Sequence, residues 1–230
     1  MMPILCGAAP QPVLIELFTS EGCSSCPAAD AVLEELDRTQ PLHGIQVIAV
    51  SEHVDYWNHI GWKDPFSNPA FSRRQEQYAR RFRLASVYTP QLVVDGNSEL
   101  VGSDRQSVRQ AILNAAKDQK LAVRIRTLPT SVMVEIDSPT TNDAVLMLAS
   151  ADSSVATSNV IRGENSGRLL RHVAVVRSLK EIGVVTKGKP FSTTVPVVDG
   201  TGNKRWIAFV QERGQGRILG VASSLDMEAK

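Results

Sequence analysis

The chain has 230 residues, of which 43% are hydrophobic and 21% charged, and this length is comfortable for two globular domains of roughly 100–150 residues each. The formal net charge is +1 without a long run of one sign, which excludes recruitment of nucleic acid by electrostatics, so we expect no nucleic-acid partner. No stretch approaches the roughly 20 apolar residues of a membrane helix, so we expect no membrane span.

The chain begins with an apolar stretch, "MMPILCGAAP", that ends in small residues. We interpret residues 1–11 as a leader or the remnant of a signal peptide, and we leave Cys6 out of the chemistry for that reason. From there to residue 120, strand patterns alternate with helix patterns. In chain order, the sequence predicts a buried strand at 12–18, a helix that starts after Ser24 or Ser25, a strand at 45–52, an irregular segment at 53–68, a helix at 68–82, a hairpin of strands 90–96 and 98–102, and a helix at 103–119.

Five arginines gather in and just after the helix predicted at 68–82. They are interleaved with Glu76 and glutamines at helical spacing, so we interpret them as a solvated helix face rather than as an anion site. The five are Arg73, Arg74, Arg80, Arg81 and Arg83.

After residue 120 the pattern changes to short alternating apolar runs separated by turns. About seven strands at this spacing favour a sandwich of β-sheets. We therefore expect an α/β domain at 12–120, followed by a smaller all-β, sandwich-like domain at 121–230.

The stretch "LFTSEGCSSCPAAD" places Cys23 and Cys26 where a buried strand gives way to a helix. A helix N-terminus stabilises an anion and lowers the pKa of a thiol there. We expect Cys23 to project at the surface and to attack, and the more buried Cys26 to resolve the mixed disulfide. A structural disulfide and a metal clamp remain alternatives.

Three features together resemble the thioredoxin superfamily. They are the cysteine pair inside a strand–helix–strand unit, the dipeptide Thr89–Pro90 before a strand, and Glu16, an acidic residue within an otherwise apolar strand. The resemblance implies a thioredoxin-like fold for 12–120, a cis bond before Pro90, and substrate binding by Thr89 and Pro90. It also implies that Glu16 helps to move the proton of the second cysteine.

Longer stretches resemble a bacterial family of secreted, thioredoxin-like proteins that is catalogued as a domain of unknown function. The matching stretches are "ELFTSEGCSSCPAAD", "SEHVDYWNHIGWKDPF" and "RGENSGRLLRHVAVVR". This resemblance implies a β-rich tail and a periplasmic or secreted location.

The segment 51–66 is rich in aromatic residues and histidines, and it follows a predicted strand. One interpretation is a packed loop. In another, His53 tunes the thiolate. In a third, His53 joins Cys23 and Cys26 to bind copper or zinc, since two thiolates and an imidazole suit these metals. In the motif "RGENSGRLLRH", we expect an inter-domain polar network made by Arg162, Glu164 and Asn165.

The leading hypothesis is a thiol–disulfide oxidoreductase of the cell envelope, with Cys23, Cys26 and Glu16 as catalytic residues, protein thiols or disulfides as partners, and no cofactor. The first alternative is a copper-binding or copper-delivery module that uses Cys23, Cys26 and His53. The second alternative is a non-catalytic protein-interaction module.

Overall fold

The computed structural model describes residues 9–137, 140–197 and 204–227, so most of the expected leader, Cys6 included, lies outside the described residues. The elements are β1 (Gln11–Thr19), α1 (Cys26–Thr39), β2 (Ile45–His53), the short 3-10 helix η1 (Asn58–Ile60), α2 (Pro69–Phe82), β3 (Gln91–Val94), β4 (Ser98–Val101), α3 (Arg105–Ala115), β5 (Val123–Leu128), β6 (Ser131–Ile136), β7 (Ala144–Asp152), β8 (Ala156–Asn159), β9 (Leu169–His172), β10 (Val176–Val185), β11 (Phe191–Pro196), β12 (Lys204–Glu212), β13 (Ile218–Ser223) and η2 (Ser224–Met227).

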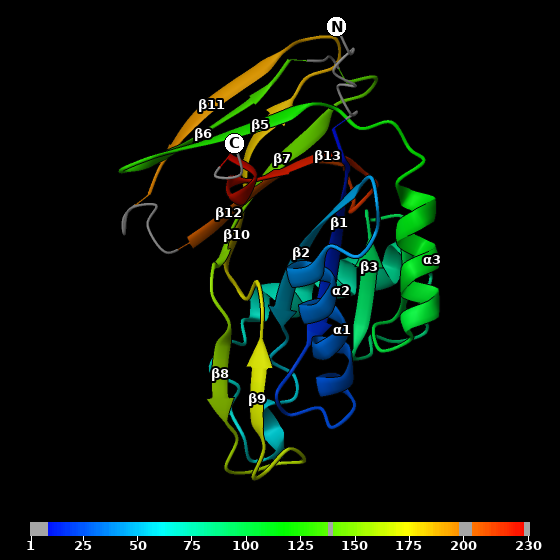
Figure 1. Ribbon diagram of the computed structural model, residues 1–230, viewed down its shortest axis with the longest axis vertical. Helices are drawn as coiled ribbons and strands as arrows, with labels where there is room; N and C mark the ends of the chain where they lie inside the picture. Colours follow the sequence, from blue (N-terminus) through cyan, green and yellow to red (C-terminus); the bar gives the residue numbers. More distant parts are fainter. Residues whose placement is uncertain (1–8, 138–139, 198–203, 228–230) are drawn as a thin grey trace, which may run out of the picture.

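The described strands form four sheets. The first has the order β2-β1-β3-β4, with β1 and β2 parallel and β3 antiparallel to β1. The second has the order β10-β7-β12-β13, the third β11-β6-β5, and the hairpin β8–β9 stands alone. Figure 1 shows β5, β6 and β11 at the top, β7, β12 and β13 below them, and β1 to β3 with the helices lower still.

The sheets stack because β1, in the middle of the first sheet, is mostly apolar on both faces. Along β1, Val13, Ile15 and Leu17 pack against α1 and α3. Leu14, on the opposite face, joins a core that includes residues of α2, β7, β12 and β13. The other face of the second sheet packs on the third sheet. Alternation along β1 therefore places helices on one side of the first sheet and a second sheet on the other.

The expected fold class, an α/β thioredoxin-like domain followed by a smaller all-β domain, is wrong. Strands make up 42% of the chain and helices 21%. In the described part of the chain, nine of the thirteen strands follow residue 122. The physical reason is that the later apolar runs do not form a sandwich only among themselves. Strands β7, β12 and β13 also bury residues against β1 and β2, so the structure is a mostly β stack.

The individual elements before residue 120 are close to their predicted ranges. Helix α2 begins after Asn68, whose side chain accepts a hydrogen bond from the backbone N–H of Ala70, and Pro69 occupies its first turn. Beyond residue 120, the sequence did not predict β8 as a separate strand.

The hairpin β8–β9, residues 156–172, forms an arm that leaves the second sheet. In Figure 1 it runs down beside α1 to the lower end of the molecule. Arg171 in β9 pairs with Glu34 in α1, with an N–O distance of 3.0 Å. Just after the arm, the carbonyl of Ala174 accepts a hydrogen bond of 2.9 Å from the N–H of Ser51 at the end of β2. The arm thus brings a late part of the chain to α1, and the residues after it reach the end of β2.

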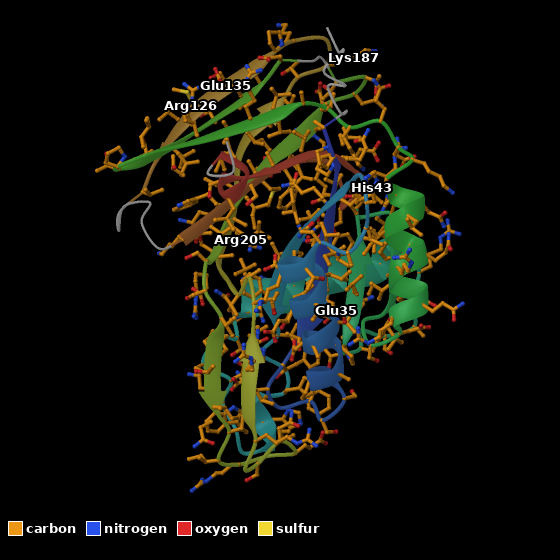
Figure 2. All side chains as sticks on the ribbon, viewed as in Figure 1. Glu35, His43, Arg126, Glu135, Lys187 and Arg205 are labelled. Carbon is orange, nitrogen blue, oxygen red and sulfur yellow. A yellow bond between two sulfur atoms is a disulfide. The ribbon has the colours of Figure 1, made fainter. Side chains whose placement is uncertain are left out.

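A charged contact also joins α1 to the second sheet, above the arm in Figure 1. Arg205 of β12, labelled in Figure 2, donates from both terminal nitrogens to the Asp37 carboxylate of α1, at 2.5 and 3.0 Å. Helix α1 is therefore held by the arm and by the second sheet.

None of the helices in the described part of the chain combines the length and the apolar character that a membrane crossing needs.

Candidate functional site

The cysteine pair closes a tight turn at the start of α1, and we call residues 20–26 the cysteine turn. Cys26 is the first residue of the helix, and its N–H donates to the carbonyl of Cys23 at 3.2 Å. The two sulfur atoms form a disulfide, with the Cα atoms 5.4 Å apart. Ser25 stands at the N-cap position without capping the helix, and its hydroxyl lies 3.3 Å from the Cys23 sulfur.

The pair is covered. Cys23 is 1% exposed and Cys26 is fully buried, although Ser24 and Ser25 between them are exposed. The expectation that Cys23 projects at the surface is therefore wrong, whereas a buried Cys26 was expected. Neighbouring segments enclose Cys23 without covering the serines.

Thr89 and Pro90 lie beside the pair, as the sequence resemblance implied. The Thr89–Pro90 bond is cis, so that prediction is confirmed. The carbonyl oxygen of Thr89 is 3.8 Å from the Cys23 sulfur. The indole N–H of Trp57 donates to the Thr89 hydroxyl at 2.8 Å, which holds this residue in place. The irregular segment at 53–68 therefore positions the residue that faces Cys23.

Glu16 is not brought to the cysteines. It lies between Leu14 and Phe18 on the face of β1 that is turned away from α1. Its carboxylate accepts a 2.6 Å hydrogen bond from Arg74 and a 2.5 Å hydrogen bond from the Tyr78 hydroxyl. The predicted role of Glu16 in moving the cysteine proton has no support in these contacts.

Arg74 corrects a second expectation. It is only 5% exposed, so it is not part of a solvated helix face, whereas Arg73 is exposed. It also lies 3.6 Å from Glu52. Burial raises the pKa of Glu52 well above its usual range, although the charge of Arg74 opposes this shift. This buried ion cluster holds α2 against the first sheet.

A different polar cluster lies next to the cysteine turn, and the sequence did not indicate it. His172 of the arm stands between two carboxylates, 3.3 Å from Glu21 and 3.5 Å from Asp30. Burial disfavours its charge, but the two carboxylates outweigh burial and raise the pKa of His172 to about 9. Asp30 also accepts from the Thr19 hydroxyl at 3.0 Å, and Glu21 from the Trp62 indole at 2.7 Å. A buried imidazolium therefore ties the residues on both sides of the pair to the arm.

His53 extends this cluster. Its ring meets that of His172 edge to face, with centroids 4.6 Å apart, and its Nδ1 is 2.7 Å from Asp64. Burial raises the pKa of Asp64, but His53 and the backbone N–H groups of Glu21 and Phe66 outweigh this and hold it below its usual range. The Nε2 of His53 is buried and has no hydrogen-bond partner.

The metal alternative is not favoured by this geometry. Within residues 9–137, 140–197 and 204–227, no group of three or more histidine, cysteine, aspartate or glutamate side chains is arranged to hold a metal ion. Cys23 and Cys26 are joined to each other, and His53 binds Asp64. Nothing in these contacts supports the proposed copper site.

The loop between β8 and β9, residues 160–168, reaches the cysteine turn, and we call it the arm loop. The side-chain amide of Asn165 donates to the carbonyl oxygens of Glu21 at 2.8 Å and of Cys23 at 2.9 Å. Glu164 accepts from the N–H of Ser24 at 3.0 Å. Two of the three residues expected to form a polar network thus do so, and Arg168, which donates to Asn165, completes it in place of Arg162.

Comparison with known proteins identifies a family and one similar fold. The family described as "Protein of unknown function (DUF1223)" matches residues 14–211. A crystal structure of a protein from Agrobacterium tumefaciens is similar over 95% of both chains, with a TM-score of 0.79 and 23% identity. A β-glucosidase from Listeria innocua aligns with 45% of this chain and 15% of its own, with 10% identity, but its TM-score of 0.21 carries no argument. A comparison with curated proteins gave no match.

Proposed function

Since the chain belongs to the DUF1223 family, described as proteins of unknown function, we propose its function from the site alone. The protein is a thiol–disulfide oxidoreductase of the cell envelope that exchanges disulfides with partner proteins through Cys23 and Cys26. The observation that carries the proposal is the disulfide at the first residue of α1, with a backbone carbonyl 3.8 Å from the Cys23 sulfur.

The short ring argues against a purely structural disulfide. Loop closure by a disulfide stabilises a protein through the chain entropy that it removes, and this term grows with loop length. The ring from Cys23 to Cys26 has a sequence separation of only 3, so its entropic contribution is about 2 kcal/mol, against about 3 kcal/mol for a 15-residue loop. A disulfide that closes so short a ring stabilises the fold less than one that closes a long loop, so a reactive role explains the pair better.

The position of the pair suits thiol exchange. In the oxidising direction, a partner thiolate attacks the Cys23 sulfur, a mixed disulfide forms, and Cys26 leaves as a thiolate. A second partner thiol then attacks the mixed disulfide and releases Cys23. The partner loses two electrons and two protons, and the pair gains them. The reducing direction is the reverse, with the Cys23 thiolate as the attacking group.

Neighbouring groups support these roles. The N–H groups at the start of α1 favour a thiolate there. Asp30 follows Cys26 by one helical turn and is also buried, so in this proposal it takes the proton-transfer role expected of Glu16. The carbonyl of Thr89 beside Cys23 is available to a partner backbone. Disulfides persist in oxidising compartments, which supports a periplasmic or secreted location.

Redox equilibration with glutathione tests the proposal. We expect the wild-type pair to be reduced and reoxidised reversibly, with a potential above about −300 mV, because structural disulfides generally lie below that value. The variant Cys26→Ser should accumulate one glutathione per chain at Cys23. Its matched control, Cys23→Ser, should accumulate much less, because the proposal makes Cys23 the sulfur that partners attack, whereas burial alone, at 1% and 0% exposed, predicts no difference between the two cysteines. A pair that glutathione cannot reduce, or equal labelling of both variants, would refute the proposal and favour an interaction module.

A further inference from the structure

The arm loop is hydrogen-bonded to the cysteine turn through the side chains of Asn165 and Glu164. Asn165 is fully buried, and its amide donates to two carbonyl oxygens of that turn. Arg168 donates to the amide oxygen of Asn165 at 3.0 Å and fixes its orientation. A fully buried side chain from 142 residues further along the chain thus holds the backbone of Cys23 itself.

Glu164 adds a negative charge to the same turn. Its carboxylate accepts from the N–H of Ser24, the residue next to Cys23, and this hydrogen bond lowers the pKa of Glu164. Glu164 is therefore ionised at neutral pH. It takes an N–H close to the helix N-terminus, where a thiolate would otherwise gain stabilisation.

We propose that the arm loop controls the reactivity of Cys23, with Asn165 as the latch that keeps the disulfide covered and Glu164 as the charge that favours its oxidised form. This inference rests on the proposed function, because control matters only for a pair that reacts. Both residues act through the backbone of the cysteine turn, so they are positioning residues.

The charge argument has a definite sign. Reduction of the pair creates a thiolate at Cys23, and a carboxylate nearby raises the free energy of that thiolate. A carboxylate several ångströms from a thiol raises the pKa of that thiol by about half a unit in water, and burial of the thiol strengthens the repulsion. Glu164 therefore raises the pKa of Cys23 and shifts the equilibrium toward the disulfide.

The arm is built in a way that permits opening. Its two strands have four residues each and form a two-stranded sheet of their own, so side-chain contacts such as Arg171–Glu34 and His172–Glu21, rather than a shared sheet, hold the arm in place. Ile161 in the arm loop is 65% exposed and Leu169, just after the loop, is 67% exposed, whereas Val160 is fully buried. The loop can therefore swing away without unfolding the stacked sheets.

The latch is tested by the rate at which a small phosphine reductant reduces the disulfide. We expect Asn165→Ala to be reduced about tenfold faster or more than the wild type, because two hydrogen bonds that close the loop are lost. Asn159→Ala is the matched control, since Asn159 is an exposed asparagine of the same arm. A rate for folded Asn165→Ala within twofold of both references would overturn the latch.

The charge is tested separately with Glu164→Gln, an isosteric change at an exposed position that leaves the fold intact. In the Cys26→Ser background, the pKa of Cys23 should fall by about half a unit. With both cysteines present, the equilibrium constant for oxidation by glutathione should fall about threefold. Glu35→Gln, a change of the same kind in α1 (Figure 2), should alter neither value. An unchanged Cys23 pKa in Glu164→Gln would overturn the charge effect.

The two experiments distinguish a failure of this inference from a failure of the proposed function. If glutathione leaves the wild-type pair untouched, the oxidoreductase proposal fails. The phosphine rates still decide whether Asn165 covers the disulfide, since they need no redox partner.

Discussion

Raising the pH from about 6 to about 10 should remove the charge of His172 and much of the stability that depends on it. The groups that face this ring are the carboxylates of Glu21 and Asp30, the ring of His53, and Phe66. The two carboxylates raise the pKa of His172 from 6.5 to about 9, against the effect of burial. Folding therefore favours the protonated ring.

The size and the sign of the effect follow from linkage. A pKa that is higher in the folded state contributes stability that is complete below the unfolded pKa of 6.5 and is lost as the pH rises through 9. Each pKa unit corresponds to about 1.4 kcal/mol, so the shift is equivalent to about 3 kcal/mol. We expect the free energy of unfolding to fall by roughly this amount between about pH 6 and pH 10.

Urea unfolding at a series of pH values measures this loss, and the titration of the ring in NMR spectra measures the pKa directly. His172→Gln is the control. It should be less stable than the wild type at pH 6, because the two carboxylates lose their charged partner, and its stability should vary little between pH 6.5 and 9. A wild-type pKa at or below 6.5, or an equal pH dependence in the variant, would refute the reasoning.

Two further substitutions test the contacts that hold α2. Arg74→Met should lower the free energy of unfolding by about 3–5 kcal/mol, because it removes the positively charged partner of two buried carboxyl groups, while Arg73→Met at an exposed position should change it by less than about 0.5 kcal/mol. Equal effects would argue against the buried ion cluster. Asn68→Ala should cost about 1 kcal/mol in urea unfolding through the lost helix cap, and an unchanged midpoint would show that the cap does not contribute.

Local pattern predicted the elements of the first 120 residues well. The apolar runs and the caps depend on neighbours in sequence, which is why the strand at 12–18 and the helix at 68–82 are found close to their predicted bounds. The predicted fold class was wrong because the hydrophobic pattern of a strand does not show which element packs against each of its faces. Strand β1 is apolar on both faces, and nothing local indicates whether a helix or a second sheet covers each one.

The site could be predicted only in part for the same reason. Cys23, Cys26 and the Thr89–Pro90 dipeptide are brought together, as the resemblance to the thioredoxin superfamily implied. The same resemblance assigned Glu16 to the pair, but alternation along the strand directs its side chain to the opposite face.

The sequence indicated the polar groups around the cysteine turn less clearly than it indicated the cysteine pair. Glu21 and Asp30 flank the cysteine motif, and both are buried acids that need a partner. Their partner, His172, comes from the arm, and no spacing within the motif predicts a residue so far away. Only the tertiary fold brings this histidine to the two acids.

The arm also has a consequence for the order in which the protein assembles. The chain emerges from its N-terminus, so Cys23 and Cys26 always appear before Asn165, which lies 142 residues after Cys23. At about 5–20 residues per second, the interval is roughly 7 to 30 seconds. A nascent chain therefore exposes its cysteine pair to oxidants and to other thiols, and the pair becomes covered only when the arm docks.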